Sequence, residues 1–489
     1  MTLMLWHRRV GMLACAALLL WSVSGAMHPL MSRYQPQPMA RAAPAISPLA
    51  PDTPALSSIL TRAALDAVTE GRLVQMPYGP AWRVETDDAG GVPRYFLASS
   101  GDEIPDGERR HAEFLARHFL GDSESSIVAI ERIERFGGDY PYVNRLLPVH
   151  RVDFARQDGM QVYVDTRQTQ LATLVDARKA RMNWIFVTFH NWRFAQASDR
   201  ARAAIAAIFL LAVLATPVLG YRVYRRRRGL ALKGVRGWHR RLGLAVSVVV
   251  LFSGVSGFWH LLKGVQDRAS MPEGPRRTHQ ILQADTLDTR ALQADTPMQS
   301  LVLLSHDGAS WARVTSLPDV QSATPRGHAA EAGHAGHASA GATGPLMEVR
   351  YIPLEGKTGV VLDDERHARI LATQLSESGP PEPTAIPITM FGGEYGFINK
   401  LLPVFRFEAG DTRLYVHVET RTLAAAVNAA DYAEGWSFAQ FHKWQALEAL
   451  LGRWPRDLLQ IGFALAMTLV SLLGLGLFWR RGPAQSRKN

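Results

Sequence analysis

Cysteine is almost absent from this chain of 489 residues, which contains only Cys15. A single cysteine excludes an internal disulfide, a CxxC redox pair, an iron–sulfur cluster and a covalent CxxCH haem site. Any metal chemistry in this chain must therefore use histidine, methionine or carboxylate side chains.

The short motifs of several enzyme classes are also missing. The sequence contains no HExxH, GxSxG, Walker or dinucleotide-binding glycine motif, which argues against a hydrolase and against a flavin or NAD(P)H site in this chain. If the protein carries electrons, its donor must be a quinol or another protein.

Acidic residues are absent between Asp199 and Asp267, although the whole chain has 44 of them and a formal net charge of +10. That interval contains nine clustered cations: Arg222, Arg225, Arg226, Arg227, Arg228, Lys233, Arg236, Arg240 and Arg241. Apolar runs flank them on both sides, which is typical of a short cytoplasmic loop between membrane helices. We therefore expect a lipid bilayer, and no nucleic acid, as the partner of this positive charge.

Four stretches are long and apolar enough, or nearly so, to cross a bilayer core of about 30 Å, which takes roughly 17 to 25 residues. They are Val10–Met27, Ala203–Tyr221, Leu242–Leu262 and Leu458–Trp479. Each has basic residues at one end, and cytoplasmic loops carry the Lys/Arg excess. The sequence predicts a multi-pass protein of a bacterial inner membrane, with both termini in the cytoplasm and the two long intervening segments in the periplasm.

An internal repeat relates the first and third of these stretches. Leu5–Gly11 (LWHRRVG) matches Gly237–Gly243 (GWHRRLG), and Val23–His28 matches Val255–His260, both at an offset of 232 residues (239 − 7 and 260 − 28). The first stretch also has the basic start and apolar run of a cleavable signal peptide. Because its copy in mid-chain cannot be a signal peptide, we expect the first stretch to be a retained helix.

The repeat continues through the outer segments. Phe136–Val149 matches Phe391–Val404 at an offset of 255 (391 − 136). Further matches are Val162–Arg167 with Val416–Arg421, and Phe189–Trp192 with Phe441–Trp444. The increase in offset marks an insertion, which we place at about 324–344, where a His/Gly/Ala-rich stretch has the low complexity of a flexible loop.

The predicted fold is an integral-membrane, α-helical four-helix bundle with two periplasmic α+β domains and an internal twofold repeat. Glu108–Leu120 has helical spacing, whereas VYVDT and VHVET alternate as half-buried strands do. The predicted segments are transmembrane helices at 1–28, 203–221, 242–262 and 458–479, outer domains at 29–202 and 263–457, a basic cytoplasmic loop at 222–241 and a cytoplasmic tail at 480–489.

These motifs together resemble a known family over nearly the whole chain. The strand sequence QVYVDTRQTQLATL is similar to the Val-Asp-x-x-Thr-Gly-x-Val hairpin of the PepSY domain, without its usual glycine. The His-Arg-Arg-x-Gly helix starts and the Phe-His-x-Trp segments resemble the PepSY-associated transmembrane family. This resemblance implies an association with iron uptake and, in some members, a ferric-siderophore reductase with b-type haem.

Three membrane-edge histidines recur in each half, and ionisable residues at such positions are functional hypotheses by default. They are His7, His28 and His190 in the first half and His239, His260 and His442 in the second. Neutral imidazole is a good axial ligand for haem iron, and histidines on facing helices can hold a haem in a bundle core.

The spacing of these histidines places them at two faces of the membrane. His7 and His28 are 21 residues apart, or about 31 Å along a helix. We expect His7 and His239 to share one haem near the cytoplasm. The four outer histidines leave several pairings open: His28 with His260, His190 with His442, or one histidine from each helix of a half.

Other histidines and aromatic residues have simpler interpretations. His328, His334 and His337 in the insertion could bind a transition metal, since His-rich tracts do, but a solvated linker also explains them. We expect His111 and His367 to be surface residues of outer-domain helices. Trp6, Trp192, Trp238 and Trp444 are interpreted as an interfacial aromatic belt.

The sequence thus supports two functions of different classes. The first is an inner-membrane b-type haem protein that takes electrons from a quinol or protein donor and passes them to a periplasmic ferric-siderophore or other metal acceptor. The alternative is a non-redox PepSY membrane protein that binds or regulates a periplasmic partner.

Overall fold

The structure is a computed structural model, and it describes residues 2–87, 91–195, 198–227, 232–270, 276–292, 296–316, 348–355, 361–392 and 394–479, without the side chains of 267–270 and 397. The chain forms two compact units. One contains residues 1–34, 178–272 and 429–489, and the other contains residues 35–177 and 273–428. Each unit therefore combines segments from both halves of the repeat.

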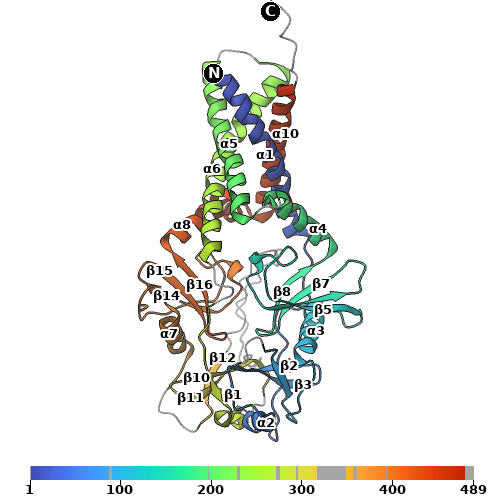
Figure 1. Cartoon of the computed structure of the whole chain (residues 1–489), viewed down its shortest axis with the longest axis vertical. Coiled ribbons are helices and arrows are strands. Elements are labelled where there is room, and N and C mark those ends of the chain that lie inside the picture. Colours follow the sequence, from blue (N-terminus) through green and yellow to red (C-terminus); the bar gives the residue numbers. More distant parts are fainter. Residues whose placement is uncertain are drawn as a thin grey trace, which may run out of the picture. The chain divides into compact units, whose positions relative to one another are not determined.

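The helical unit is built from four long helices, α1 (Leu3–Tyr34), α5 (Asp199–Arg226), α6 (Gly234–Ser270) and α10 (Arg453–Trp479). In the described part of the chain, these four are long and apolar enough to cross a membrane. They include all four predicted stretches and extend beyond them at polar ends, because a helix continues wherever its backbone bonds can form. The start of α1 and the end of α10 lie at the same end of the bundle (Figure 1).

Packing in this bundle follows the order α1, α5, α6, α10 and back to α1. Small residues bring the helices close together, since Ala14 and Ala17 of α1 are fully buried. They pack with Leu210 and Val213 of α5 and Val250 of α6 in one apolar core. In this order, α1 and α6, which carry the matching WHRR motifs, are diagonal to each other.

Each half enters the bundle through the same series of short elements. In the first half these are α4 (Ala177–Ile185), a π-helical turn η2 (Phe186–His190) and the 3-10 turn η3 (Arg193–Ala195). In the second half they are α8 (Ala429–Ser437), a π-helical turn η7 (Phe438–His442) and α9 (Gln445–Leu451). π-Helical turns are rare and frequently mark functional sites.

The second unit, residues 35–177 and 273–428, corresponds to the predicted outer domains and is called the outer unit below. It contains two four-stranded antiparallel sheets, each with one amphipathic helix. The first sheet is β5 (Ile127–Ile133), β6 (Val149–Phe154), β7 (Gln161–Asp165) and β8 (Gln170–Val175), and α3 (Gly107–Leu120) packs on it. The second is β13 (Ile386–Ile388), β14 (Val404–Ala409), β15 (Thr412–His417) and β16 (Thr422–Asn428), and α7 (Asp364–Leu375) packs on it. The predicted α+β organisation of the outer domains is present in both halves.

A third, six-stranded antiparallel sheet joins the two halves within the outer unit. Its order is β12 (Glu348–Pro353), β11 (Ala309–Ser316), β10 (Met298–His306), β2 (Glu70–Met76), β3 (Gly79–Glu85) and β4 (Arg94–Leu97). The halves meet where β10 pairs with β2, with Leu301 opposite Leu73 and Val302 opposite Arg72. Smaller elements of the same unit include α2 (Leu56–Arg62) and the short strands β1 (Ala67–Val68) and β9 (Leu282–Gln283).

The strand register corrects one predicted equivalence of the repeat. The sequence match pairs Val162 with Val416, an offset of 254, but the sheets place the same irregularity after Tyr163 in one half and after Tyr415 in the other, an offset of 252 (415 − 163). A shift of two residues keeps every side chain on the same face of a strand, so the apolar alternation fits both alignments equally well. Thr169 stands where the PepSY-like motif has glycine, and it has the positive φ of 49° that glycine would adopt easily.

Candidate histidine sites

The two π-helical turns bring His190 and His442 together. Their ring centres are 6.2 Å apart and the ring planes are at 80°. Each ring stacks on the phenylalanine that begins its own π-turn, with Phe186 4.6 Å from His190 and Phe438 4.7 Å from His442. One of the pairings left open by the sequence is therefore present as a close pair of imidazoles.

Hydrogen bonds orient both rings through the same nitrogen. His190 Nδ1 lies 3.2 Å from the Ser24 hydroxyl, which itself donates to the Leu20 carbonyl at 2.6 Å. His442 Nδ1 lies 3.4 Å from the Ser253 carbonyl oxygen. A histidine that donates from Nδ1 keeps the lone pair of Nε2 free, which is how metal-ligating histidines are commonly held.

His7 and His239 form a second pair on the diagonal helices α1 and α6. Their ring centres are 6.5 Å apart and their planes are at 53°. His239 Nδ1 lies 3.1 Å from the Val470 carbonyl oxygen, so this ring is oriented like those of His190 and His442. The Thr216 backbone lies beside His7, but within the described residues the buried His7 Nδ1 has no hydrogen-bond partner.

A glycine of a neighbouring helix lies against each of the four rings. A Cβ atom would come 3.2 Å from His7 at Gly220 and 3.2 Å from His239 at Gly474. It would come 3.9 Å from His190 at Gly25 and 3.6 Å from His442 at Gly257. Each long helix supplies one of these glycines, and Gly25 and Gly257 are repeat partners at the offset of 232. In the sequence these two glycines belong to the Ser-Gly pair shared by Val23–His28 and Val255–His260, but the pattern alone did not predict a role for that pair.

His28 and His260 have different surroundings. Both are exposed. His28 lies against Phe186, at 6.0 Å between ring centres and a tilt of 54°. His260 stacks on Phe438 at 4.0 Å and 21°, and its Nδ1 donates to Glu434 at 2.7 Å. The predicted alternative pair of His28 and His260 is not among the close ring pairs of the described residues.

Some of the remaining predicted sites lie outside the described residues, and one of the tryptophan interpretations is wrong. His328, His334 and His337, with the insertion at about 324–344, lie outside the described residues, as do residues 480–489. Trp192 is only 4 % exposed and packs edge-on against Trp21 in the bundle core, so the belt interpretation is wrong for this residue. Trp6 and Trp238 are 50 % and 58 % exposed, as expected of belt residues.

His111 and His367 are buried, so their interpretation as surface residues is wrong. They are 0 % and 4 % exposed. In the first half the Tyr95 hydroxyl donates to Glu108 at 2.5 Å, with His111 Nδ1 3.1 Å from the same hydroxyl. The second half repeats this arrangement: the Tyr351 hydroxyl donates to Asp364 at 2.7 Å, and His367 Nδ1 lies 3.2 Å from the same hydroxyl.

Burial controls the protonation of this first-half triad. Burial is the largest influence on the pKa of His111 and lowers it to about 3, so His111 is neutral at pH 7. Burial alone would raise the pKa of Glu108, but the positive charge of Arg83 and hydrogen bonds from Thr166 and Tyr95 lower it to about 2. The carboxylate is therefore ionised and compensated within the domain.

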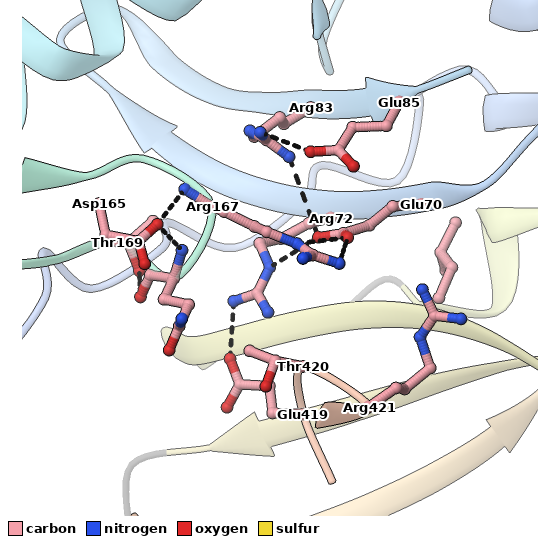
Figure 2. Close-up of polar contacts among 12 residues, drawn as sticks. Glu70, Arg72, Arg83, Glu85, Asp165, Arg167, Thr169, Glu419, Thr420 and Arg421 are labelled. Atoms are coloured by element: carbon pink, nitrogen blue, oxygen red, sulfur yellow. Dashed lines mark hydrogen bonds and ion pairs between the residues drawn. The ribbon is translucent and has the colours of Figure 1, made fainter. Parts of the chain in front are cut away.

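Buried ion pairs also connect the hairpin turns of both halves to strand β2 (Figure 2). Arg167 of the first turn donates to Glu70, and Arg72 donates to Glu419 of the second turn at 2.6 Å. In the corrected register Arg167 and Glu419 are equivalent positions with opposite charges (419 − 167 = 252). The first turn supplies the cation and the second turn the carboxylate, and their partners, Glu70 and Arg72, lie two residues apart on β2. These ion pairs attach both four-stranded sheets to the six-stranded sheet.

The donor sets available in the bundle are pairs. Within the described residues, no group of three or more His, Cys, Asp or Glu side chains could hold a metal ion. A tetrahedral zinc site needs three or four protein ligands, whereas haem iron takes four ligands from the porphyrin and needs only axial ones. The chemistry of two imidazole pairs therefore fits haem.

The sequence matches no protein-family model and no curated protein. The resemblance to PepSY-associated membrane proteins accordingly depends on the motifs quoted above.

Proposed function

We propose that this chain is a membrane electron-transfer protein of the PepSY-associated type, which holds two b-type haems and passes electrons across the bilayer to an iron acceptor. The proposal depends on two close imidazole pairs, each with one histidine from each half of the repeat. The ring centres are 6.5 Å apart for His7 and His239 and 6.2 Å apart for His190 and His442.

This spacing is compatible with one haem iron that both imidazoles of a pair would hold. Metal–imidazole bonds are about 2.0–2.1 Å long, and the ring centre lies roughly 1.1 Å beyond the ligating nitrogen, so the two ring centres of such a pair are about 6.3 Å apart. Direct hydrogen bonding between two imidazoles would need only about 3 Å between nitrogens, and neither pair has such a bond among the described hydrogen bonds. The similar spacing in both pairs supports the same function, haem ligation, for each of them.

The protein residues would position the group and control its surroundings. A bound haem supplies one-electron transfer, with a potential set by its ligands and their hydrogen bonds. Ser24, Ser253 and Val470 orient three of the ligand rings through Nδ1, and the four glycines let the rings approach the helices closely. Ser24, which contacts His190, lies 17 residues along α1 from His7. The two histidine pairs, called the two tiers below, are therefore about 26 Å apart along the helix axis.

The direction of transfer comes from the basic clusters and the resemblance. We place the His7–His239 tier at the cytoplasmic face, where a quinol or protein donor would reduce it, and the His190–His442 tier at the periplasmic face of a bacterial inner membrane. A ferric siderophore or a related ferric complex is the proposed acceptor.

The reduced-minus-oxidised spectrum of the purified protein tests this proposal. Wild-type protein should show the bands of b-type haem in proportion to protein, and the variant with His7, His190, His239 and His442 all changed to Ala should show none. A wild-type protein without haem, after expression with ample haem supply, would favour the non-redox alternative.

A further inference from the structure

The second half of the repeat continues from the outer imidazole pair to an exposed histidine. His442 stacks on Phe438 at 4.7 Å and 14°, and Phe438 stacks on His260 at 4.0 Å and 21°. These three rings form a continuous stack. Its inner end is a member of the proposed haem-ligand pair, and its outer end is a side chain that is 52 % exposed.

The exposed ring at the end of this stack is held as metal-ligating histidines are held. His260 Nδ1 donates to Glu434 Oε1 at 2.7 Å, and the Glu434 side chain is only 12 % exposed. A carboxylate that accepts from Nδ1 fixes the ring and its tautomer and raises the basicity of Nε2. Within the described residues His260 Nε2 has no hydrogen-bond partner, so this nitrogen is available to bind a metal at the exposed side of the ring.

The first half does not have this arrangement. His28 is the repeat partner of His260, but its contact with Phe186 is longer and tilted, at 6.0 Å and 54°. At the offset of 252 that relates the two π-turns, the position of Glu434 is occupied by Met182 (434 − 252), which cannot accept the Nδ1 proton of His28 as a carboxylate does. The two halves therefore differ where a symmetric structural anchor would have been the same.

We propose that His260, oriented by Glu434, is the docking ligand for the electron acceptor, and that electrons leave the protein through the stack of His442, Phe438 and His260. This inference depends on the proposed haem function of the His190–His442 pair. The acceptor is a ferric complex with at least one exchangeable coordination position, which His260 Nε2 occupies.

The electron balance of the step is simple. The acceptor's Fe(III) gains one electron and becomes Fe(II), and that electron comes from ferrous haem held by His190 and His442, which becomes ferric. His260 Nε2 displaces the exchangeable ligand, a water molecule, from the acceptor metal, so one metal–oxygen bond breaks as the bond from Nε2 to the metal forms. The bond to Nε2 breaks in turn when the Fe(II) product dissociates, and the haem is reduced again by the quinol or protein donor.

Copper binding tests the docking ligand independently of electron transfer. Cu(II) is the probe, and the full-length protein carries His328→Ala, His334→Ala and His337→Ala so that the insertion cannot compete. Electron paramagnetic resonance of the first equivalent bound should show imidazole coordination that His260→Ala removes, and Glu434→Gln should weaken binding by about tenfold, as loss of an outer-shell partner does. Unchanged copper coordination in His260→Ala would overturn the docking assignment.

Reoxidation kinetics test the exit path. The dithionite-reduced protein is mixed with ferric nitrilotriacetate, whose coordination sites are exchangeable, and reoxidation of the haem band is followed by stopped flow. His260→Ala should keep its haem content and slow reoxidation by about tenfold or more, since loss of even an outer-shell partner of a metal ligand costs about tenfold or more. His28→Ala should slow it less, because its stack is less close.

His279 supplies the matched control, since it is an exposed histidine paired with a carboxylate, Asp87, at 3.3 Å and has no described stack with a proposed haem ligand. His279→Ala should leave reoxidation unchanged. Loss of haem in His260→Ala, or equal slowing in the His28 and His260 variants, would overturn the exit path. A protein without haem would refute the proposed function, while the copper experiment would still decide whether His260 is a metal ligand.

Discussion

His190 and His442 lie 6.2 Å apart, ring centre to ring centre, although 252 residues separate them in the sequence. Each ends a π-helical turn that begins with phenylalanine. The turn adds a residue to the helical repeat and so changes the direction of the side chain that follows it. His190 and His442 are equivalent residues of the two halves, so a single ligand between them would be held in the same way by each half.

The inner pair should behave as a unit. His7→Ala and His239→Ala should each remove one haem, because either change leaves a single axial ligand at a site built for two. The double variant should be no worse than either single variant, since the effects of residues that act together are not additive. Haem content per chain checks this, and an additive loss on combining the changes would show that the two histidines act separately.

The glycines beside the rings provide a second prediction. Gly474→Val should lower the haem content toward that of His239→Ala, since even a Cβ atom there would lie 3.2 Å from the His239 ring. Gly476→Val is the matched control on the same helix, because a Cβ at that position would meet no neighbouring element within 4 Å in the described part of the chain. If both variants bind the same amount of haem, close approach of the helix to His239 is unimportant.

The buried triad of the outer domain predicts acid sensitivity. The pKa of His111 falls from 6.5 to about 3 on folding, so below pH 6.5 the unfolded chain binds a proton that the folded domain does not. The contribution of His111 to stability should therefore be lost as the pH falls from 6.5 toward 3, by roughly 2–5 kcal/mol. Glu108 adds to the loss below about pH 4.5, because its pKa is about 2 in the folded domain.

Thermal unfolding of the full-length protein between pH 8 and pH 4 measures this effect. His111→Gln should reduce the dependence between pH 6.5 and 4.5, where the carboxylates contribute little. His118→Gln is the control, since His118 is on the same helix and its Nε2 bonds to the Ala42 carbonyl near the surface. An unchanged pH profile in His111→Gln would contradict the buried, neutral state of this histidine.

Membrane orientation can be measured with reporter fusions. Fusions after Asp52 and Pro297 should report a periplasmic location and a fusion after Arg228 a cytoplasmic one, since nine basic residues cluster around that loop. A periplasmic signal at Arg228 would reverse the orientation. Absence of about the first 26 residues from the mature protein would show that the first helix is a signal peptide.

The sequence was sufficient for the coarse fold. Long apolar runs predicted the four helices, and matching motifs predicted that the two halves share their architecture. Both signals are local or repeated, and they do not depend on tertiary contacts. The register of the hairpin strands was wrong by two residues, because strand periodicity is also two and the pattern cannot distinguish the alternatives.

The candidate site was predicted less completely. The six recurring histidines were visible, but the selection of His190 over His28 depends on a π-helical turn that no simple pattern indicates. His111 was misplaced because it lies at the edge of the apolar face of its helix, next to Ala112 and Leu115. Only the tertiary fold shows that His111 is buried with its Nδ1 beside the Tyr95 hydroxyl, which donates to Glu108.

The haem content of the outer-tier variants tests the central claim most directly. The pyridine haemochrome assay on purified protein should give two haems per chain for the wild type, one for His190→Ala, one for His442→Ala and one for both changes together. Two haems per chain in the His190 and His442 variants, or none in the wild type, would contradict the account.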